Sequence, residues 1–142
     1  MFRAVILAAL TVAMAVGCGK KHDWKEVTDE DPRLEAARQQ ARDEYPTFVK
    51  ALKKPKALTL YSAEVMYEAN GAKELVSLEV HKATEDEITG AVIGFPTDVK
   101  LSSGEIITVP VSTLVDWQIE NAEGEKQGGY VAAERVKLQR GG

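Results

Sequence analysis

Residues 58–82 read LTLYSAEVMYEANGAKELVSLEVHK, and this stretch predicts a β-hairpin. Two runs in which apolar and polar residues alternate flank Asn70-Gly71, the residue pair that most favours a two-residue type I′ turn. A period of two is typical of a strand that buries one face. We therefore expect two antiparallel strands joined directly by this turn.

The turn also predicts the register of the hairpin. One face should be apolar and the other mostly polar, and a slip of one residue would exchange the two faces. The alternation therefore specifies the register strongly. The expected pairs are Tyr61–Val80, Ala63–Leu78 and Val65–Val76 on the apolar face, and Leu60–His81, Ser62–Glu79 and Glu64–Ser77 on the other.

Three further strands are predicted after the hairpin, at 88–95, 105–111 and 115–119. Gly90 and Gly94 fall on one side of the first, which indicates that another backbone or a helix approaches closely there. Pro110 cannot donate a ladder hydrogen bond, so the second is expected at a sheet edge. A polar loop at 121–129 and a short helix at 131–138 complete the chain.

A helical segment is predicted ahead of the hairpin. Asp31-Pro32 supplies an N-cap oxygen and a proline suited to the first helical position. Pro46 lies inside the apolar stripe that follows, so we expect a kink or two consecutive helices that meet near Glu44-Tyr45. The stripe consists of Leu34, Ala37, Ala41, Tyr45, Phe48 and Leu52.

Four lysines follow in the run KALKKPK at 50–56. One interpretation is that they complement a helix C-terminus ahead of the stop at Pro55. The alternative is that they attract the segment to anionic lipid. The acidic balance of the chain favours the first interpretation.

Together these elements predict an α+β domain, in which an N-terminal helical segment packs on a small, coiled, mainly antiparallel sheet of five strands. We expect the helical segment to cover the apolar face. A partly closed barrel is the variant that strong coiling would produce. Residues 31–142 are enough for one such domain with its own core.

The first 18 residues, MFRAVILAALTVAMAVGC, have a different character. Arg3 precedes an apolar stretch shorter than the roughly 20 residues that span a bilayer, and small residues follow, as in a secretory signal. The junction before Cys18, the single cysteine, resembles a bacterial lipobox. We therefore expect a signal peptide at 1–17, a lipidated N-terminus and tether at 18–30, and lipid attachment at Cys18.

This resemblance implies a membrane-anchored lipoprotein of the bacterial cell envelope. Gly19 follows Cys18, which in a Gram-negative cell resembles the pattern for the outer membrane, with the domain facing the periplasm. The chain carries 22 acidic and 18 basic residues, a net charge of −4, and nucleic-acid binding needs a basic surface. We therefore expect a membrane contact and no nucleic acid.

No catalytic set, metal site or cofactor is predicted. The sequence holds no phosphate-binding loop, and its two histidines cannot complete a Ser-His-Asp or Cys-His set. His81 has no Cys, His or acidic partner at ligand spacing, so we interpret it as a solvated strand residue.

The most suggestive group is Asp116-Trp117 followed by Gly128-Gly129-Tyr130. Aromatic rings beside a carboxylate and a flexible backbone are typical of surfaces that contact peptides or glycans. The structural interpretation is that Trp117 packs in the core, Asp116 caps a turn, and Gly128-Gly129 reverses the chain.

Four segments in this order also resemble a known family: GAVIGFP at 90–96, LSSGE at 101–105, VDW at 115–117 and GGY at 128–130. The chain is similar over residues 34–138 to a bacterial domain of unknown function, DUF2314. Members usually carry Glu-His-x-Trp where this chain has Glu74-Leu75-Val76-Ser77, and often Asn where it has Gly94. The resemblance implies a fold and no activity.

Two classes of function remain open. The first is a lipid-anchored, non-catalytic module that binds a protein or peptide in the envelope. The second is an enzyme with an unrecognised site around Asp116, which would act with Glu74 or a tyrosine. The first accounts for the anchor and needs no catalytic set.

Overall fold

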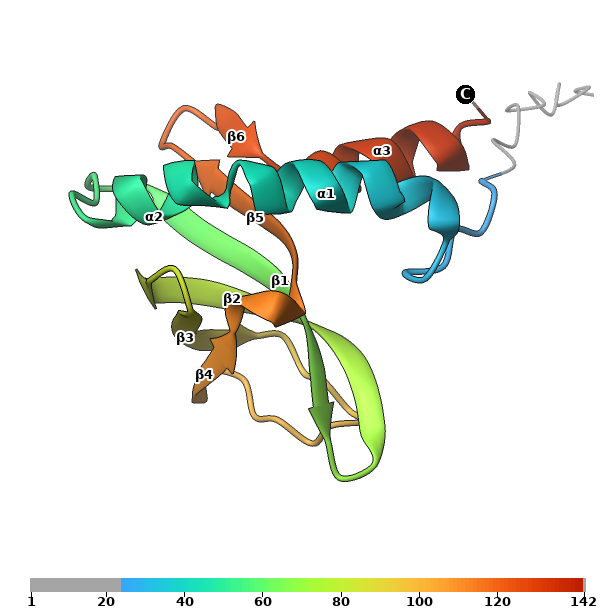
Figure 1. Cartoon of the computed structure of the whole chain (residues 1–142), viewed down its shortest axis with the longest axis horizontal. Helices are drawn as coiled ribbons and strands as arrows, with labels where there is room; N and C mark the ends of the chain where they lie inside the picture. The colour runs from blue at the N-terminus through green and yellow to red at the C-terminus, as the bar shows by residue number, and fades with distance from the viewer. Residues whose placement is uncertain (1–23, 142) are drawn as a thin grey trace, which may run out of the picture.

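A computed structural model describes residues 24–141 and shows an α+β domain (Figure 1). Helices lie along one side, and a strongly bent antiparallel sheet lies beneath them. The elements in chain order are η1 (Pro32–Leu34), α1 (Glu35–Asp43), α2 (Tyr45–Leu52), β1 (Leu60–Ala69), β2 (Ala72–Ala83), β3 (Glu87–Ile93), β4 (Ile106–Pro110), η2 (Val111–Thr113), β5 (Leu114–Glu120), β6 (Lys126–Gly128) and α3 (Tyr130–Gln139).

Over residues 24–141 the sheet has six strands in the order β4-β3-β2-β1-β5-β6, so the prediction of five strands was wrong. The missed strand is β6, three residues within the expected polar loop at 121–129. Asn121 forms the turn before it by accepting hydrogen bonds from the backbone N–H groups of Glu123 and Glu125. This turn returns the chain to β5, where Glu120 pairs with Lys126.

The partly closed barrel was also wrong, because β4 and β6 are separate edges of an open sheet. Coiling comes from two irregularities, one between Glu64 and Val65 against β5 and one between Val80 and Lys82 against β3. Such bulges bend a strand and increase its twist without joining the edges.

The predicted hairpin register is confirmed for four of the expected pairs, from Ser62↔Glu79 to Val65↔Val76. The ladder continues to the turn at Asn70-Gly71 and ends at Ser62 in the other direction, so the two outermost expected pairs are not part of it. The exposed His81 lies in the irregularity where β2 pairs with β3.

The helical segment begins and breaks where the sequence predicted. The carboxylate of Asp31 accepts a hydrogen bond from the backbone N–H of Arg33, and Pro32 occupies the first position of η1. Helix α1 ends at Asp43 and α2 begins at Tyr45, so the prediction of two consecutive helices is confirmed. Pro46 in the first turn of α2 explains the break, because a proline cannot donate the hydrogen bond that would continue α1.

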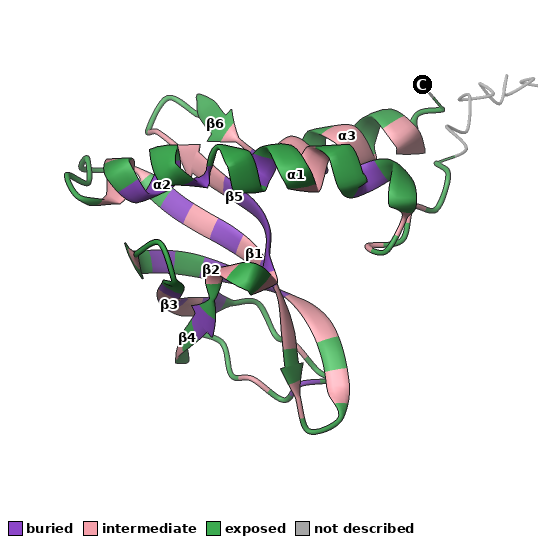
Figure 2. Ribbon diagram, in the orientation of Figure 1, coloured by how far each residue is buried: buried purple, intermediate pink, exposed green. Residues whose placement is uncertain are grey.

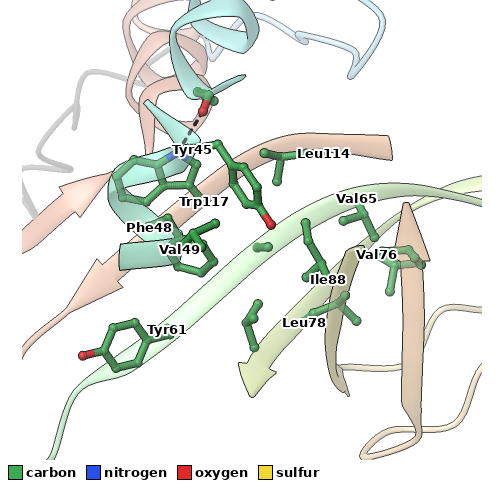
Figure 3. Close-up of a cluster of buried hydrophobic side chains, with 14 of the residues drawn as sticks. Tyr45, Phe48, Val49, Tyr61, Val65, Val76, Leu78, Ile88, Leu114 and Trp117 are labelled. Carbon is green, nitrogen blue, oxygen red and sulfur yellow. Dashed lines mark hydrogen bonds between the residues drawn. The ribbon is translucent and has the colours of Figure 1, made fainter. Parts of the chain in front are cut away.

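The core lies between α1, α2 and the apolar face of the sheet, as the alternation predicted. Along β1, buried residues alternate with partly exposed ones (Figure 2). Trp117 and Phe48 are the largest fully buried side chains, and their ring centroids lie 5.3 Å apart (Figure 3). The other buried members of this core are Ala41, Tyr45, Val49, Tyr61, Ala63, Val65, Val76, Leu78, Val80, Ile88, Val92, Val99, Val109 and Leu114.

Gly90 in β3 and Gly94 in the turn after it differ in their surroundings. A Cβ on Gly90 would collide with the backbone carbonyl of Glu79, which confirms the expected close approach. Gly94 has open space around it and a φ of +79°, so there the prediction was wrong and the glycine serves a turn instead. Strand β4, which ends at Pro110, lies at a sheet edge as expected.

Residues 24–30, which fall in the predicted tether, contact the domain. The backbone N–H of Lys25 donates to the carbonyl of Gln139 at 3.1 Å. Arg135 forms an ion pair with Asp29 at 2.6 Å, and Arg140 lies over the Trp24 ring. The expected signal peptide, Cys18 and the start of the tether lie outside the described residues. Within residues 24–141, no helix is long and apolar enough to span a membrane.

Candidate functional site

The structure brings Asp116, Trp117, Gly128, Gly129 and Tyr130 together at one junction. Strand β5 carries the first two between β1 and β6, and the glycines connect β6 to α3. Asp116 and Trp117 are buried, at 3% and 1% exposed, and both line a cavity on the polar side of the sheet. The junction also joins α3 to the sheet.

Asp116 caps α3. One carboxylate oxygen accepts from the N–H groups of Trp117 at 2.9 Å and Tyr130 at 3.2 Å. The other accepts from those of Val131 at 2.9 Å and Ala132 at 3.2 Å. Burial raises the pKa of Asp116, and the four backbone hydrogen bonds act in the opposite direction. Because a helix N-terminus leaves such N–H groups without partners, the carboxylate has a structural role here.

Trp117 fixes the other side of the junction. Its indole N–H donates to the carbonyl of Ala41 at 2.9 Å, which ties β5 to α1 (Figure 3). The Tyr130 ring meets the indole edge-on, at 5.8 Å between centroids. The Tyr130 hydroxyl donates to the carboxylate of Glu44, and burial with this contact raises the pKa of Tyr130 to about 12.

Both glycines are favoured by their backbone conformation, and Gly128 also by its close contact with Trp117. Gly128 and Gly129 have φ values of +80° and +70°, in the left-handed region that favours glycine. A Cβ on Gly128 would lie 2.7 Å from Cε3 of the Trp117 ring, and one on Gly129 would lie 2.9 Å from Oε1 of Gln118. The pair therefore lets α3 begin directly against β5.

Glu74 lies in a different part of the domain. Its carboxylate accepts hydrogen bonds from the backbone N–H groups of Thr97, Asp98 and Val99, the closest at 2.9 Å from Asp98. Glu74 therefore holds the loop after β3, whereas Asp116 holds α3. The contacts described for these two carboxylates involve separate segments of backbone.

The polar side of the sheet carries a surface that we call the open face, formed by Leu60, Ser62, Glu64, Ser77, Ile93 and Gln118. Cross-strand pairs assemble it: Ser77↔Ile93 joins β2 to β3, Glu64↔Ser77 joins β1 to β2, and Ser62↔Gln118 joins β1 to β5. These six residues line a cavity of about 250 Å³ that opens at the surface, together with Ala63, Asp116, Trp117, Gly129 and Ala132.

Glu64 supplies the charge of the open face. One of its carboxylate oxygens is buried without a hydrogen-bond partner among the described residues, and so is Nε of Arg135. Burial raises the pKa of Glu64, Asp116 and Asp29 raise it further, and Arg135 lowers it. The carboxylate is thus polar, partly desolvated and at the wall of a cavity, which is typical of a binding group.

A pH-dependent effect follows from this environment. The folded-state pKa of Glu64 lies above its ordinary value of 4.5. Protonation of Glu64 therefore contributes to the free energy of unfolding, and this contribution is complete below pH 4.5. This contribution is lost as the pH rises through the folded-state pKa. Glu64→Gln is therefore expected to stabilise the domain by roughly 1 kcal/mol at neutral pH and to give no advantage below the ordinary pKa.

Urea unfolding across this pH range measures the difference. Glu79→Gln is the matched control, since Glu79 is an exposed carboxylate that pairs with Ser62 in the same sheet. A wild-type chain that is more stable than Glu64→Gln at neutral pH would contradict the expectation, because Glu64 would then be held by its contacts.

The sequence did not single out Glu64 as a site residue. Its place on the polar face was predicted, but its pairing with Asp116 across β1 and β5 joins residues far apart in the chain. Within residues 24–141, no group of three His, Cys, Asp or Glu side chains could hold a metal ion. The open face can thus offer one carboxylate, hydroxyls, an amide and apolar side chains.

Fold and site define a small α+β domain with an open antiparallel sheet, whose polar side bears an acidic, partly apolar cavity. The chain belongs to the family described as "Uncharacterized protein conserved in bacteria (DUF2314)", whose model matches residues 31–138. No significant match was found to a curated protein or to a solved structure. The family resemblance found in the sequence is confirmed.

Proposed function

We propose that this protein is a lipid-anchored module of the bacterial envelope, which binds a protein or peptide segment on the open face and catalyses no reaction. The observation that carries the proposal is the cavity beside Glu64. Leu60 and Ile93 at this cavity are 41% and 42% exposed, so both leave apolar surface at its edge. A partner that covered them would bury apolar surface.

The chemistry of the open face indicates the kind of segment. A cavity of about 250 Å³ is smaller than the roughly 300–1,000 Å³ of most small-molecule sites, but it accommodates one side chain of a larger partner. Glu64 complements a cation at its wall, and Leu60 and Ile93 complement apolar neighbours. The segment expected is therefore basic and apolar, with a lysine or arginine that enters the cavity.

Photo-crosslinking in living cells tests this binding. A photoreactive residue in place of Ile93 is expected to trap one or a few discrete partners. The matched position is Glu123, an exposed residue in the turn before β6, where no partner is expected. Failure to trap a partner at Ile93 with normal expression, or the same products from both positions, would contradict binding on the open face.

The anchor is supported by the apolar leader that ends at Cys18 and by the lack of any second cysteine that could form a disulfide. The membrane proposed is the outer membrane in a Gram-negative cell, with the domain in the periplasm. Anchoring places the open face among envelope proteins and gives the single cysteine a function.

Cys18→Ala is the corresponding prediction. The substitution is expected to abolish incorporation of labelled fatty acid and to release the protein from the membrane fraction, because it removes the thiol that carries the lipid. Metabolic labelling and fractionation measure both effects. Thr28→Ala, outside the lipobox, is the control and should keep the label. Continued labelling of Cys18→Ala would show that the site is wrong.

A further inference from the structure

A second concave surface lies beside α2, on a different part of the domain from the open face. This groove has a volume of about 860 Å³ and runs between α2, the turn before β3 and η2. Tyr45, Val49 and Val111 supply its apolar side chains. We call it the lysine groove, because Lys50, Lys53 and Lys54 line it.

The lysines of the groove have no partners in the described part of the chain. None of the three forms an ion pair or a hydrogen bond through its ammonium group there. The carbonyls of Lys50 and Ala51 at the end of α2 accept backbone N–H groups, from Lys53 and Lys54 respectively. The lysines can therefore interact with the end of α2 only through the helix dipole, and their ammonium groups stay available to a ligand.

The charge of the groove contrasts with that of the whole chain. The chain has a net charge of −4, whereas the groove combines the three lysines and Arg42 with a single acid, Glu85. Arg42 binds Glu35 at 3.1 Å, so the three lysines are the cations of the groove that have no ion-pair partner among the described residues. A cationic rim around apolar side chains complements a molecule that is anionic at one end and apolar at the other.

We propose that the lysine groove binds the headgroups of anionic phospholipids in the membrane to which the domain is attached, an inference that rests on the proposed lipid anchor. Only residues 19–23 separate Cys18 from Trp24, the first described residue, and the six Cα–Cα steps between them extend at most about 22 Å. The domain is thus held close to the bilayer, where lysines gain attraction to anionic lipid. Helix α2 lies at the far end of α1 from the described N-terminus (Figure 1), so this contact is separate from the anchor.

Binding to vesicles without the lipid anchor tests the proposal. A chain that begins at Gly19 keeps both clusters of the core, whose members lie between Val27 and Leu138. The probe is vesicles of equal parts phosphatidylglycerol and phosphatidylcholine, compared with vesicles of phosphatidylcholine alone. We expect sedimentation with the anionic vesicles only, weakened by salt.

A charge-matched pair of variants locates the contact. The first replaces Lys50, Lys53 and Lys54 with glutamine, and the second replaces Lys73, Lys82 and Lys100, which are exposed elsewhere. Each lysine near an anionic surface contributes about fivefold in affinity, so the first variant is expected to lose on the order of 100-fold. The second should bind like the wild-type chain.

Three results would overturn binding of anionic lipid by the lysine groove. No binding of the wild-type chain to anionic vesicles, or equal loss in the two variants, overturns the proposal. Binding to poly-glutamate without binding to vesicles also overturns it and makes the groove a protein-binding site. Because the tested chain lacks Cys18, these results are independent of lipidation, and only the fatty-acid labelling of Cys18→Ala decides the anchor.

Discussion

Replacing Trp117 with alanine is expected to lower the free energy of unfolding by about 4 kcal/mol. Trp117 is 1% exposed, packs on Phe48 and Tyr130, and donates its indole N–H to the carbonyl of Ala41. The alanine variant would leave a large cavity and a buried carbonyl without its partner. Since the free energy of unfolding of a small domain is about 5–15 kcal/mol in total, much of the stability would be lost.

Urea unfolding followed by circular dichroism measures this effect. Trp117→Phe is the control variant, because phenylalanine keeps an aromatic ring in the core but cannot donate to Ala41. We expect Trp117→Phe to lose roughly 1–2 kcal/mol. If Trp117→Ala unfolded at the same urea concentration as the wild-type chain, the junction of β5 with α1 would not support the fold as described.

The second large effect is expected for Asp116→Ala, which should lower the free energy of unfolding by about 3 kcal/mol. The substitution removes the acceptor of four backbone N–H groups, and those of Trp117 and Val131 belong to buried residues. When their acceptor is removed, these N–H groups stay buried without a hydrogen bond, and the fold is destabilised by the free energy of their desolvation. The loss should be concentrated at α3, whose first turn Asp116 holds.

Hydrogen exchange distinguishes a local from a global change in this variant. The amides of Val131 and Ala132 should exchange much faster in Asp116→Ala than those in the middle of β2. Asp116→Asn keeps one carbonyl oxygen and is expected to lose roughly half as much stability. If Asp116→Ala were as stable as the wild-type chain, the carboxylate would be available for another role, which would favour an enzyme site at this position.

Local chemistry accounts for the parts of the fold that were predicted correctly. Asn70-Gly71 and the alternation around it specify the hairpin from neighbouring residues, so its register could be predicted without the structure. Pro46 likewise marks the break between α1 and α2. In each case the decisive interaction joins residues a few positions apart.

The errors concern interactions between distant segments. Strand β6 contains no β-branched or aromatic residue, and it exists because β5 offers an edge for pairing. The Asn121 turn with Gly124 was the available signal for it. The open sheet could not be distinguished from a partial barrel, because that depends on whether the two edges meet.

The candidate site divides in the same way. The sequence identified Asp116-Trp117 and Gly128-Gly129-Tyr130 as a group, and the structure brings them together. The structural interpretation of Trp117 as a core residue agrees with its burial, whereas Asp116 caps a helix and not a turn. Glu64 could not be identified, since the alignment of β1 with β5 and the packing of α3 create its surroundings.

The contacts of residues 24–30 have a mechanical consequence under the proposed anchoring. Tension from a moving membrane would enter the fold through the Lys25–Gln139 hydrogen bond and the Asp29–Arg135 ion pair. It would therefore break these two contacts first, because each is weak, and then load η1 and α1 through the covalent chain. A force-spectroscopy trace pulled from the N-terminus should show residues 24–30 detach from α3 before the sheet ruptures.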